Sequence, residues 1–230
     1  MPSTRRDFLK LGLSTALASV PVTGGIASTG EKSGNRLRIL VLGGTGFIGP
    51  HFVRHALSRG HELTLFNRGR TNLHLFPQVE KLVGDRAKDV AALKGRRWDV
   101  VVDNSGYKSD WVERTAKLLS GAADHYLFTS TRSVYRDFSQ SGITEDAPIG
   151  LKDVPESEWK GYGPEKAACE RVLQREFQNA WTIIRPAVVV GPEDRSDRFT
   201  SWVARVDRGG EILAPGEPEN PLQFIDVRDL

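Results

Sequence analysis

The sequence predicts an α/β fold built on a doubly wound parallel sheet, with the start of a smaller lobe at its end. Short apolar runs alternate along the chain with segments of helical apolar spacing, which is the pattern of a parallel sheet covered on both faces. The first apolar run, at 37–42, leads directly into a glycine-rich turn at 43–49 and then into a helical pattern. We therefore expect a strand, a tight turn and a helix at the start of the fold.

The remaining elements follow from the same alternation. Strands are expected at 37–42, 62–66, 81–83, 99–102, 126–129 and 182–185, and helices near 47–59, 89–93, 110–119 and 164–177. Pro164 suits the first turn of the last helix, where its missing N–H is no loss.

The turn at 43–49 reads Gly-Gly-Thr-Gly-Phe-Ile-Gly and has the properties of a pyrophosphate site. Glycines let the backbone turn tightly and approach phosphates, and the N–H groups and dipole of the following helix favour negative charge. The spacing G-x-x-G-x-x-G is a variant of the G-x-G-x-x-G dinucleotide fingerprint. The expected cofactor contacts here are Gly43, Thr45, Gly46, Phe47, Ile48 and Gly49.

Further cofactor residues are expected in the loops after the strands, because ligands of open parallel sheets lie beyond the carboxyl ends. At the end of the second strand, a carboxylate would bond the ribose hydroxyls and favour NAD. This chain has Asn67 and Arg68 there instead. A cation suits a 2′-phosphate, so the sequence leans toward NADP, although Arg68 is alternatively a solvated surface side chain. Asp85, after the third strand, is placed to bond the adenine amino group or is a plain turn aspartate.

Tyr162 and Lys166 are four residues apart at the start of the last predicted helix and therefore share one face. An ordinary phenol, with a pKa near 10, is a poor base at neutral pH. A neighbouring ammonium, the helix dipole and an oxidised nicotinamide would stabilise a phenolate. Thr131, at the end of the fifth strand, could share a hydrogen bond with the substrate oxygen, or is an ordinary strand-end threonine.

Together these motifs resemble the extended short-chain dehydrogenase/reductase family, the NAD-dependent epimerase/dehydratase group. The resemblance extends from residue 37 to residue 230. It rests on GGTGFIG at 43–49, TSTRSVY at 129–135, TEDAP at 144–148, YGPEK at 162–166, RPAVVVGP at 185–192 and FIDVRDL at 224–230.

The resemblance implies roles for residues and a division of the chain. Tyr162 would be the acid/base, Lys166 its partner and Thr131 the assisting hydroxyl, while Asn104 and Ser105 would line the cofactor. It also implies an NAD(P)-binding Rossmann domain at 37–190 and the beginning of a substrate-binding lobe at 191–230. That lobe looks incomplete, because more substrate-domain sequence normally follows FIDVRDL in this family.

Family members often dimerise through a four-helix interface, for which the helices near 110–119 and 164–177 are candidates. Sugar-nucleotide 4,6-dehydratases of the family carry Asp-Glu directly after the active-site threonine. Arg132 and Ser133 occupy those positions here, which argues against that dehydration.

The expected function is therefore an NAD(P)-dependent epimerase or oxidoreductase acting on a hydroxyl or keto carbon of a sugar or sugar nucleotide. One alternative is a non-catalytic NAD(P)- or RNA-binding relative, because LFNRGRTN at 65–72 is reminiscent of chloroplast stem-loop RNA-binding proteins. The retained Tyr/Thr/Lys set argues against an RNA partner. Another alternative is a truncated chain that binds the cofactor without turnover.

The N-terminus resembles a twin-arginine export signal. TRRDFLK at 4–10 precedes a weakly apolar stretch at 11–20 that is too short to span a bilayer comfortably. We expect a signal peptide and linker start at 1–30, the twin-arginine translocase as a partner during export, and a periplasmic or extracellular location. The alternative is a basic arm that frays in the cytosol.

The composition argues against a DNA-binding protein, a disulfide-stabilised fold and a metalloprotein. The formal net charge is +3, and the scattered basic residues favour a solvated surface over a DNA-binding footprint. The single cysteine, Cys169, excludes an internal disulfide and is expected to be a small packed side chain. The five histidines show no ligand spacing, so no metal site is expected.

Residues that could border the substrate are Tyr107, Arg136, Trp159, Arg195 and Trp202.

Overall fold

The structure is a computed structural model that describes residues 36–178, 180–217 and 219–230. The predicted signal peptide at 1–30 lies outside the described residues.

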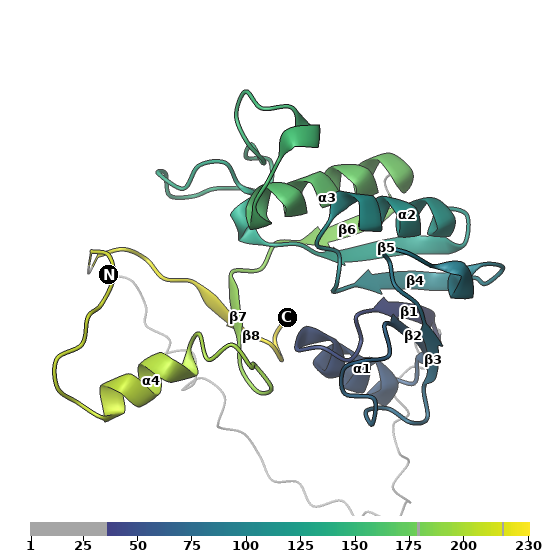
Figure 1. The fold of residues 1–230 in the computed structure, drawn as a ribbon, viewed down its shortest axis with the longest axis horizontal. Helices are drawn as coiled ribbons and strands as arrows, with labels where there is room; N and C mark the ends of the chain where they lie inside the picture. Colours follow the sequence, from purple (N-terminus) through teal and green to yellow (C-terminus); the bar gives the residue numbers. More distant parts are fainter. Residues whose placement is uncertain (1–35, 179, 218) are drawn as a thin grey trace, which may run out of the picture. The chain divides into compact units, whose positions relative to one another are not determined.

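Six parallel strands form the central sheet in the order β3-β2-β1-β4-β5-β6 (Figure 1). They are β1 (Arg38–Leu42), β2 (Glu62–Asn67), β3 (Glu80–Val83), β4 (Trp98–Asp103), β5 (Ala123–Thr129) and β6 (Trp181–Ile184). The winding reverses between β1 and β4, and a ligand site is expected at such a switch point. The predicted doubly wound fold is confirmed.

Helices cover both faces of this sheet. Helix α1 (Ile48–Ser58) lies on one face, and α2 (Ser109–Leu119) and α3 (Tyr162–Glu176) lie on the other (Figure 1). Along β1, Leu40 and Leu42 belong to the core with α2 and α3, whereas Ile39 and Val41 belong to the core with α1. Because successive strand side chains point to opposite faces and both faces are covered, the buried residues 39–42 of this strand are all apolar.

Cys169 lies in the core beneath α3 and has no exposed surface. Burial raises the pKa of its thiol to about 12. This confirms the prediction of a small packed side chain.

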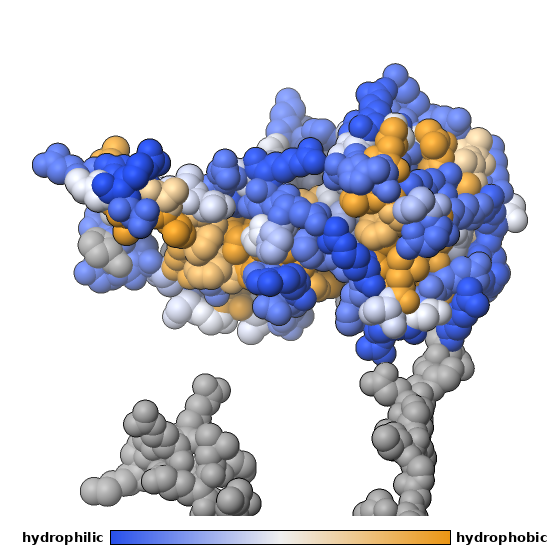
Figure 2. Space-filling view, turned by 90° about the horizontal axis from the view of Figure 1, so that it is seen from below, coloured by the Kyte–Doolittle hydropathy of each residue, from blue (hydrophilic) through white to orange (hydrophobic). Residues whose placement is uncertain are grey.

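After β6 the chain leaves the main sheet. Strands β7 (Val188–Val190) and β8 (Phe224–Asp226) pair in parallel as a separate two-stranded sheet. Helix α4 (Thr200–Asp207), between them in sequence, buries none of its residues. Figure 2 shows orange apolar groups around this part of the molecule, toward the left of the view.

The helix predicted at 89–93 is wrong. Only a short 3-10 turn, η1 (Ala91–Leu93), forms there. The carboxylate of Asp89 accepts a hydrogen bond from the backbone N–H of Ala91, and the backbones of Asp85 and Asp89 form an isolated bridge. These local bonds hold a turn instead of a helix.

The sequence also did not indicate the short turns η2 (Arg132–Val134) and η3 (Glu156–Glu158). Strand β5 begins at Ala123 instead of residue 126, and the other predicted boundaries differ by fewer residues. Within the described residues, no helix is both long and apolar enough to cross a membrane.

Candidate functional site

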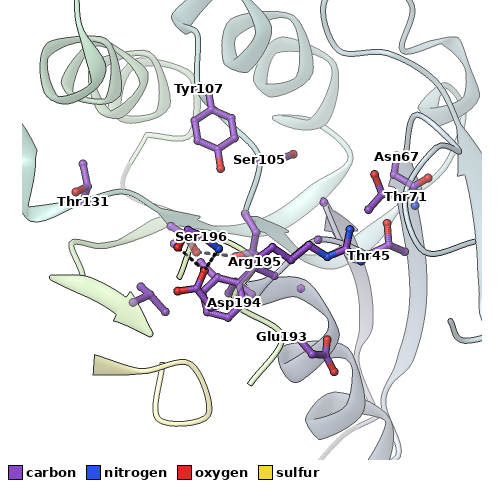
Figure 3. Close-up of a pocket in the computed structure, with 18 of the residues that line it drawn as sticks. Thr45, Asn67, Thr71, Ser105, Tyr107, Thr131, Glu193, Asp194, Arg195 and Ser196 are labelled. Carbon is purple, nitrogen blue, oxygen red and sulfur yellow. Dashed lines mark hydrogen bonds between the residues drawn. The ribbon is translucent and has the colours of Figure 1, made fainter. Parts of the chain in front are cut away.

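A cavity of about 1390 Å³ opens beyond the carboxyl ends of the central strands. Its wall comes from the loops after β1 to β5, from the start of α3 and from the segment around 186–198 (Figure 3). The topology therefore brings together segments that are far apart in the sequence.

Every catalytic and cofactor-binding residue predicted from the sequence lies on the wall of this cavity. They are Gly43, Thr45, Gly46, Phe47, Ile48, Gly49, Asn67, Arg68, Asp85, Asn104, Ser105, Thr131, Tyr162 and Lys166.

The three spaced glycines of the turn have different surroundings. Gly43 has a φ of 89°, and an added Cβ would lie 2.8 Å from the Cβ of Ser105. At Gly49 an added Cβ would lie 2.3 Å from the carbonyl oxygen of Gly43. At Gly46 no heavy atom lies within 4 Å of an added Cβ. Gly43 thus permits the turn, Gly49 permits close packing of the helix, and Gly46 leaves an open surface that a ligand can approach.

The start of α1 is available to an anion. Phe47 at the N-cap makes no side-chain capping bond, and the first turn contains no acidic residue. The N–H groups and the positive end of the helix dipole therefore face the cavity without a competing carboxylate from the helix.

Two amide side chains on the cavity wall have unused donors. Asn67 accepts a hydrogen bond from the N–H of Gly69 (2.9 Å), and Asn104 accepts one from the hydroxyl of Thr129 (2.7 Å). The buried Nδ2 atoms of both asparagines have no hydrogen-bond partner in the described part of the chain. Because a buried donor without a partner is costly, these atoms indicate that a polar ligand completes the site. The wall thus fits a dinucleotide.

Lys166 is buried and joins two of the loops that form the site. Its ammonium donates hydrogen bonds to the carbonyl oxygens of Gly106 (2.8 Å) and Thr129 (2.7 Å), and lies 4.0 Å from the ring centroid of Phe128. Burial lowers the pKa of Lys166 to about 8. The two carbonyl bonds leave one ammonium hydrogen for a further acceptor.

The start of α3 packs directly on the loop after β5. An added Cβ at Gly163 would lie 2.0 Å from the carbonyl oxygen of Ser133, so only glycine permits this contact. It places Tyr162, which is 55% exposed, on the same cavity wall as the buried Thr131. The Thr131 Oγ1 accepts a hydrogen bond from the N–H of Ser133 (3.2 Å) and keeps its own hydrogen for donation.

A buried polar network beneath the cavity was missed from the sequence. Arg86 donates to the carboxylate of Asp103 and to the hydroxyl of Thr115, both at 2.7 Å, and Tyr126 donates to Asp103 at 2.7 Å. Asp103 also accepts from the N–H of Ser105 (2.9 Å), which fixes the loop after β4. The available signal was a carboxylate, Asp103, that directly follows the three valines at 100–102.

Electrostatics explain why this buried carboxylate stays charged. Burial alone would raise the pKa of Asp103. The charge and hydrogen bond of Arg86, together with the hydrogen bonds from Tyr126 and Ser105, outweigh burial and hold that pKa below its ordinary value.

A second missed cluster supports the loop that carries Thr131. Glu170, fully buried on α3, pairs with Arg185 at 2.7 Å and accepts a hydrogen bond from the hydroxyl of Ser130. Ser130 directly precedes Thr131, so this cluster fixes the end of β5. A charged residue within the apolar pattern of the last helix was the available signal.

Only two of the five residues suggested as substrate neighbours line the cavity. Tyr107 and Arg195 do so, whereas Arg136, Trp159 and Trp202 do not. The Lys166 ammonium lies 5.5 Å from the ring centroid of Tyr107, whose hydroxyl points into the cavity in Figure 3. Partial burial, and to a lesser extent Tyr162, raise the pKa of Tyr107.

Within the described residues, no cluster of three or more His, Cys, Asp or Glu side chains is arranged to hold a metal ion.

Comparisons with known proteins agree with the fold and the motifs. The model of the NAD dependent epimerase/dehydratase family matches residues 39–230. The chloroplast stem-loop binding protein of 41 kDa b from Arabidopsis thaliana is 30% identical over 226 residues, covering 89% of this chain and 54% of that protein. A UDP-glucose 4-epimerase from Neisseria meningitidis is 26% identical over 178 residues, covering 64% of this chain and 50% of that protein. The chain thus spans about half the length of these relatives.

Among solved structures, the Bordetella bronchiseptica enzyme WbmG in complex with NAD and UDP is similar in fold. The TM-score is 0.68 at 21% sequence identity, and the match covers 83% of this chain and 65% of that protein.

Proposed function

Because the chain belongs to the NAD dependent epimerase/dehydratase family, we propose that it is an exported NAD(P)-dependent epimerase or oxidoreductase of a sugar or sugar nucleotide. The observation that carries this proposal is one cavity lined by the glycine turn together with Thr131, Tyr162 and Lys166. The UDP-glucose 4-epimerase relative supports a sugar-nucleotide substrate. The reacting centre would be a hydroxyl or keto carbon.

Different residues along the cavity wall would bind different parts of the cofactor. Gly43, Gly46 and Gly49, with the start of α1, would hold the pyrophosphate; the other contacts would come from Thr45, Phe47, Ile48, Asn67, Arg68, Asp85, Asn104, Ser105 and Lys166. When bound, NAD(P) supplies a hydride acceptor and donor at its nicotinamide ring.

Side chains of the protein would act as the acid and base. Tyr162 would remove the proton of the substrate hydroxyl, while the hydroxyl of Thr131 holds the same oxygen. The Lys166 ammonium would stabilise the phenolate and keep the loops after β4 and β5 in place through Gly106 and Thr129. Arg132 and Ser133 offer no carboxylate for the loss of water.

We further propose a preference for NADP. Arg68 and Arg70 both lie on the cavity wall after β2 and are exposed there, so either can meet a 2′-phosphate.

Export is proposed from the residues at 4–20. If the twin-arginine translocase exports the chain, replacing Arg5 and Arg6 by lysine should retain it in the cytoplasm, as measured by cell fractionation. Unchanged export of that variant would contradict the route.

The catalytic proposal is tested by incubating the protein with UDP-glucose, UDP-galactose or UDP-N-acetylglucosamine and NAD⁺ or NADP⁺. An epimerase forms the other epimer without net reduced cofactor, whereas a dehydrogenase accumulates reduced cofactor and ketone. Tyr162→Phe should lower turnover by about 10²- to 10⁴-fold, with cofactor affinity retained. Unchanged turnover in this variant would remove Tyr162 from its role.

A non-catalytic binding protein is the second candidate, favoured by the 30% identity to the chloroplast stem-loop binding protein. In that case the protein retains stem-loop RNA, with an affinity that falls steeply as salt rises. Cofactor binding without any turnover would instead indicate a chain that holds NAD(P) but lacks a complete substrate site.

A homodimer through α2 and α3 is also proposed. Within one chain these helices pack against each other, and Glu113 on α2 pairs with Arg175 on α3 at 3.7 Å, so two copies would together supply the four helices of such an interface. Light scattering after size exclusion measures the oligomeric state directly.

A further inference from the structure

The segment 191–198, after β7, is attached to helix α1 by two neighbouring contacts. Glu193 pairs with Arg54 of α1 at 2.7 Å. The ring Nε2 of His51, one turn earlier on the same helix, lies 3.2 Å from the carbonyl oxygen of Pro192. These contacts hold the segment beside the helix whose N-terminus faces the cavity.

Arg195 extends this attachment to the glycine turn. Its guanidinium donates a hydrogen bond to the side-chain oxygen of Asn72 (3.0 Å), and the amide nitrogen of Asn72 donates to the carbonyl oxygen of Thr45 (3.0 Å). In Figure 3 the Arg195 side chain reaches across the cavity toward Thr45. Two consecutive hydrogen bonds therefore connect the segment after β7, the loop after β2 and the glycine turn.

The charge of Arg195 is not neutralised by this arrangement. Its partner, Asn72, is a neutral amide, and within the described residues Arg195 has no carboxylate within ion-pair distance. The neighbouring Arg54 is paired with Glu193. Arg195 thus places an uncompensated cation on the cavity wall near the turn expected to bind a pyrophosphate.

Two residues in the connected segments have positive φ angles. Asn72 has a φ of 48° and Glu193 a φ of 71°, in the left-handed region that side chains rarely adopt. Such conformations persist where the surroundings impose them, and they cluster at ligand clamps and switches.

We propose that Arg195 is a cofactor-retaining residue. With Asn72 it forms a clasp, defined as Arg195, Asn72 and the Thr45 carbonyl, that closes segment 191–198 over the glycine turn. Its guanidinium would neutralise the pyrophosphate of a cofactor held by that turn. This inference rests on the proposed function, because it requires NAD(P) at the turn.

The test measures cofactor dissociation by stopped-flow displacement of NADPH and NADH. Arg195→Gln should release either cofactor about tenfold faster than wild type, because a charge-assisted contact is lost. Arg195→Lys, which keeps the charge but loses the planar fork, should lie between them. The matched control is Arg171→Gln, an exposed arginine of α3 that does not line the cavity.

Two further experiments separate the effect of the Arg195 charge from the effect of the hydrogen bonds that hold segment 191–198 over the turn. Arg195→Gln should weaken binding of ADP but not of adenosine, which lacks phosphates. Asn72→Ala should also speed cofactor release, and the double variant should show less than the sum of the two effects, because both residues belong to one connection.

A wild-type release rate in Arg195→Gln, with NADPH or NADH still bound, would overturn this inference and leave the proposed function intact. Equal weakening of ADP and adenosine would overturn the role of its charge. Failure of the wild-type protein to bind either cofactor would instead overturn the proposed function itself.

Discussion

Arg86 and Asp103 form a buried ion pair beneath the cavity, with Nη1 and Oδ1 2.7 Å apart. The Asp103 carboxylate also accepts a hydrogen bond from the N–H of Ser105, so the pair connects the sheet interior to the loop after β4. A buried pair is sensitive to loss of one partner, because the other charge is left without compensation.

Replacing Arg86 by methionine should lower the free energy of unfolding by about 3–5 kcal/mol, as measured by urea denaturation. The control, Arg96→Met, breaks the exposed pair with Glu80 and should cost about 0–1 kcal/mol. In Arg86→Met/Asp103→Leu, removal of the stranded charge should restore part of the loss. Equal small effects of both single variants would show that the buried pair contributes little.

The burial of Lys166 predicts a pH dependence of stability. Its folded-state pKa is about 8, below the ordinary 10.5, so between these values the unfolded chain binds more protons than the folded chain. Stability therefore rises with pH across this window, by up to about 1.4 kcal/mol per pH unit from this group. The cost of burying the charge is fully present below pH 8.

The measurement is the difference in unfolding free energy between wild type and Lys166→Met, without cofactor, from pH 7 to 11. This difference should shift in favour of wild type between pH 8 and 10.5 and level off on either side. A constant difference would mean that Lys166 titrates normally in the folded protein.

The glycines of the turn should separate folding from binding. Gly49→Ala places a methyl group 2.3 Å from a backbone oxygen and should destabilise the fold by about 1–3 kcal/mol. Gly46→Ala meets no atom within 4 Å, so its stability should stay within about 0.5 kcal/mol of wild type. If the pyrophosphate lies on this turn, Gly46→Ala should nevertheless weaken NAD(P)H binding, as measured by fluorescence titration. Normal affinity would place the pyrophosphate elsewhere.

Arg68 should determine cofactor choice if it meets a 2′-phosphate. Arg68→Ala should then weaken NADPH binding about tenfold and leave NADH binding nearly unchanged. Calorimetric titration of both cofactors gives the ratio. Equal affinity changes for the two cofactors would remove Arg68 from this role.

Much of the fold was predictable because its signals are local. The apolar run before the glycine turn gave β1 and α1, and the spacing of Tyr162 and Lys166 placed both on α3. The helix at 89–93 failed for a local reason that spacing does not reveal, since Asp89 bonds the backbone of Ala91 and holds a turn.

The site was predictable where a motif defines it and not where distant side chains complete it. Arg86 reaches Asp103 because the central sheet brings their loops together, and Arg195 reaches Asn72 because the segment after β7 lies against α1. Neither pair has a spacing that a single sequence reveals. Helix α4 escaped prediction because it buries no side chain, so its apolar residues do not follow a core-facing pattern.

The solitary thiol of this chain sits on α3, one turn from the ammonium that anchors the cavity loops, and has no accessible surface. A thiol-reactive dye can modify it only when α3 lifts from the sheet, so the labelling rate reports how often that helix opens. Ligands that stabilise the closed helix would slow the labelling in proportion to their occupancy. The labelling rate of this native cysteine therefore measures local opening of α3 without an engineered probe.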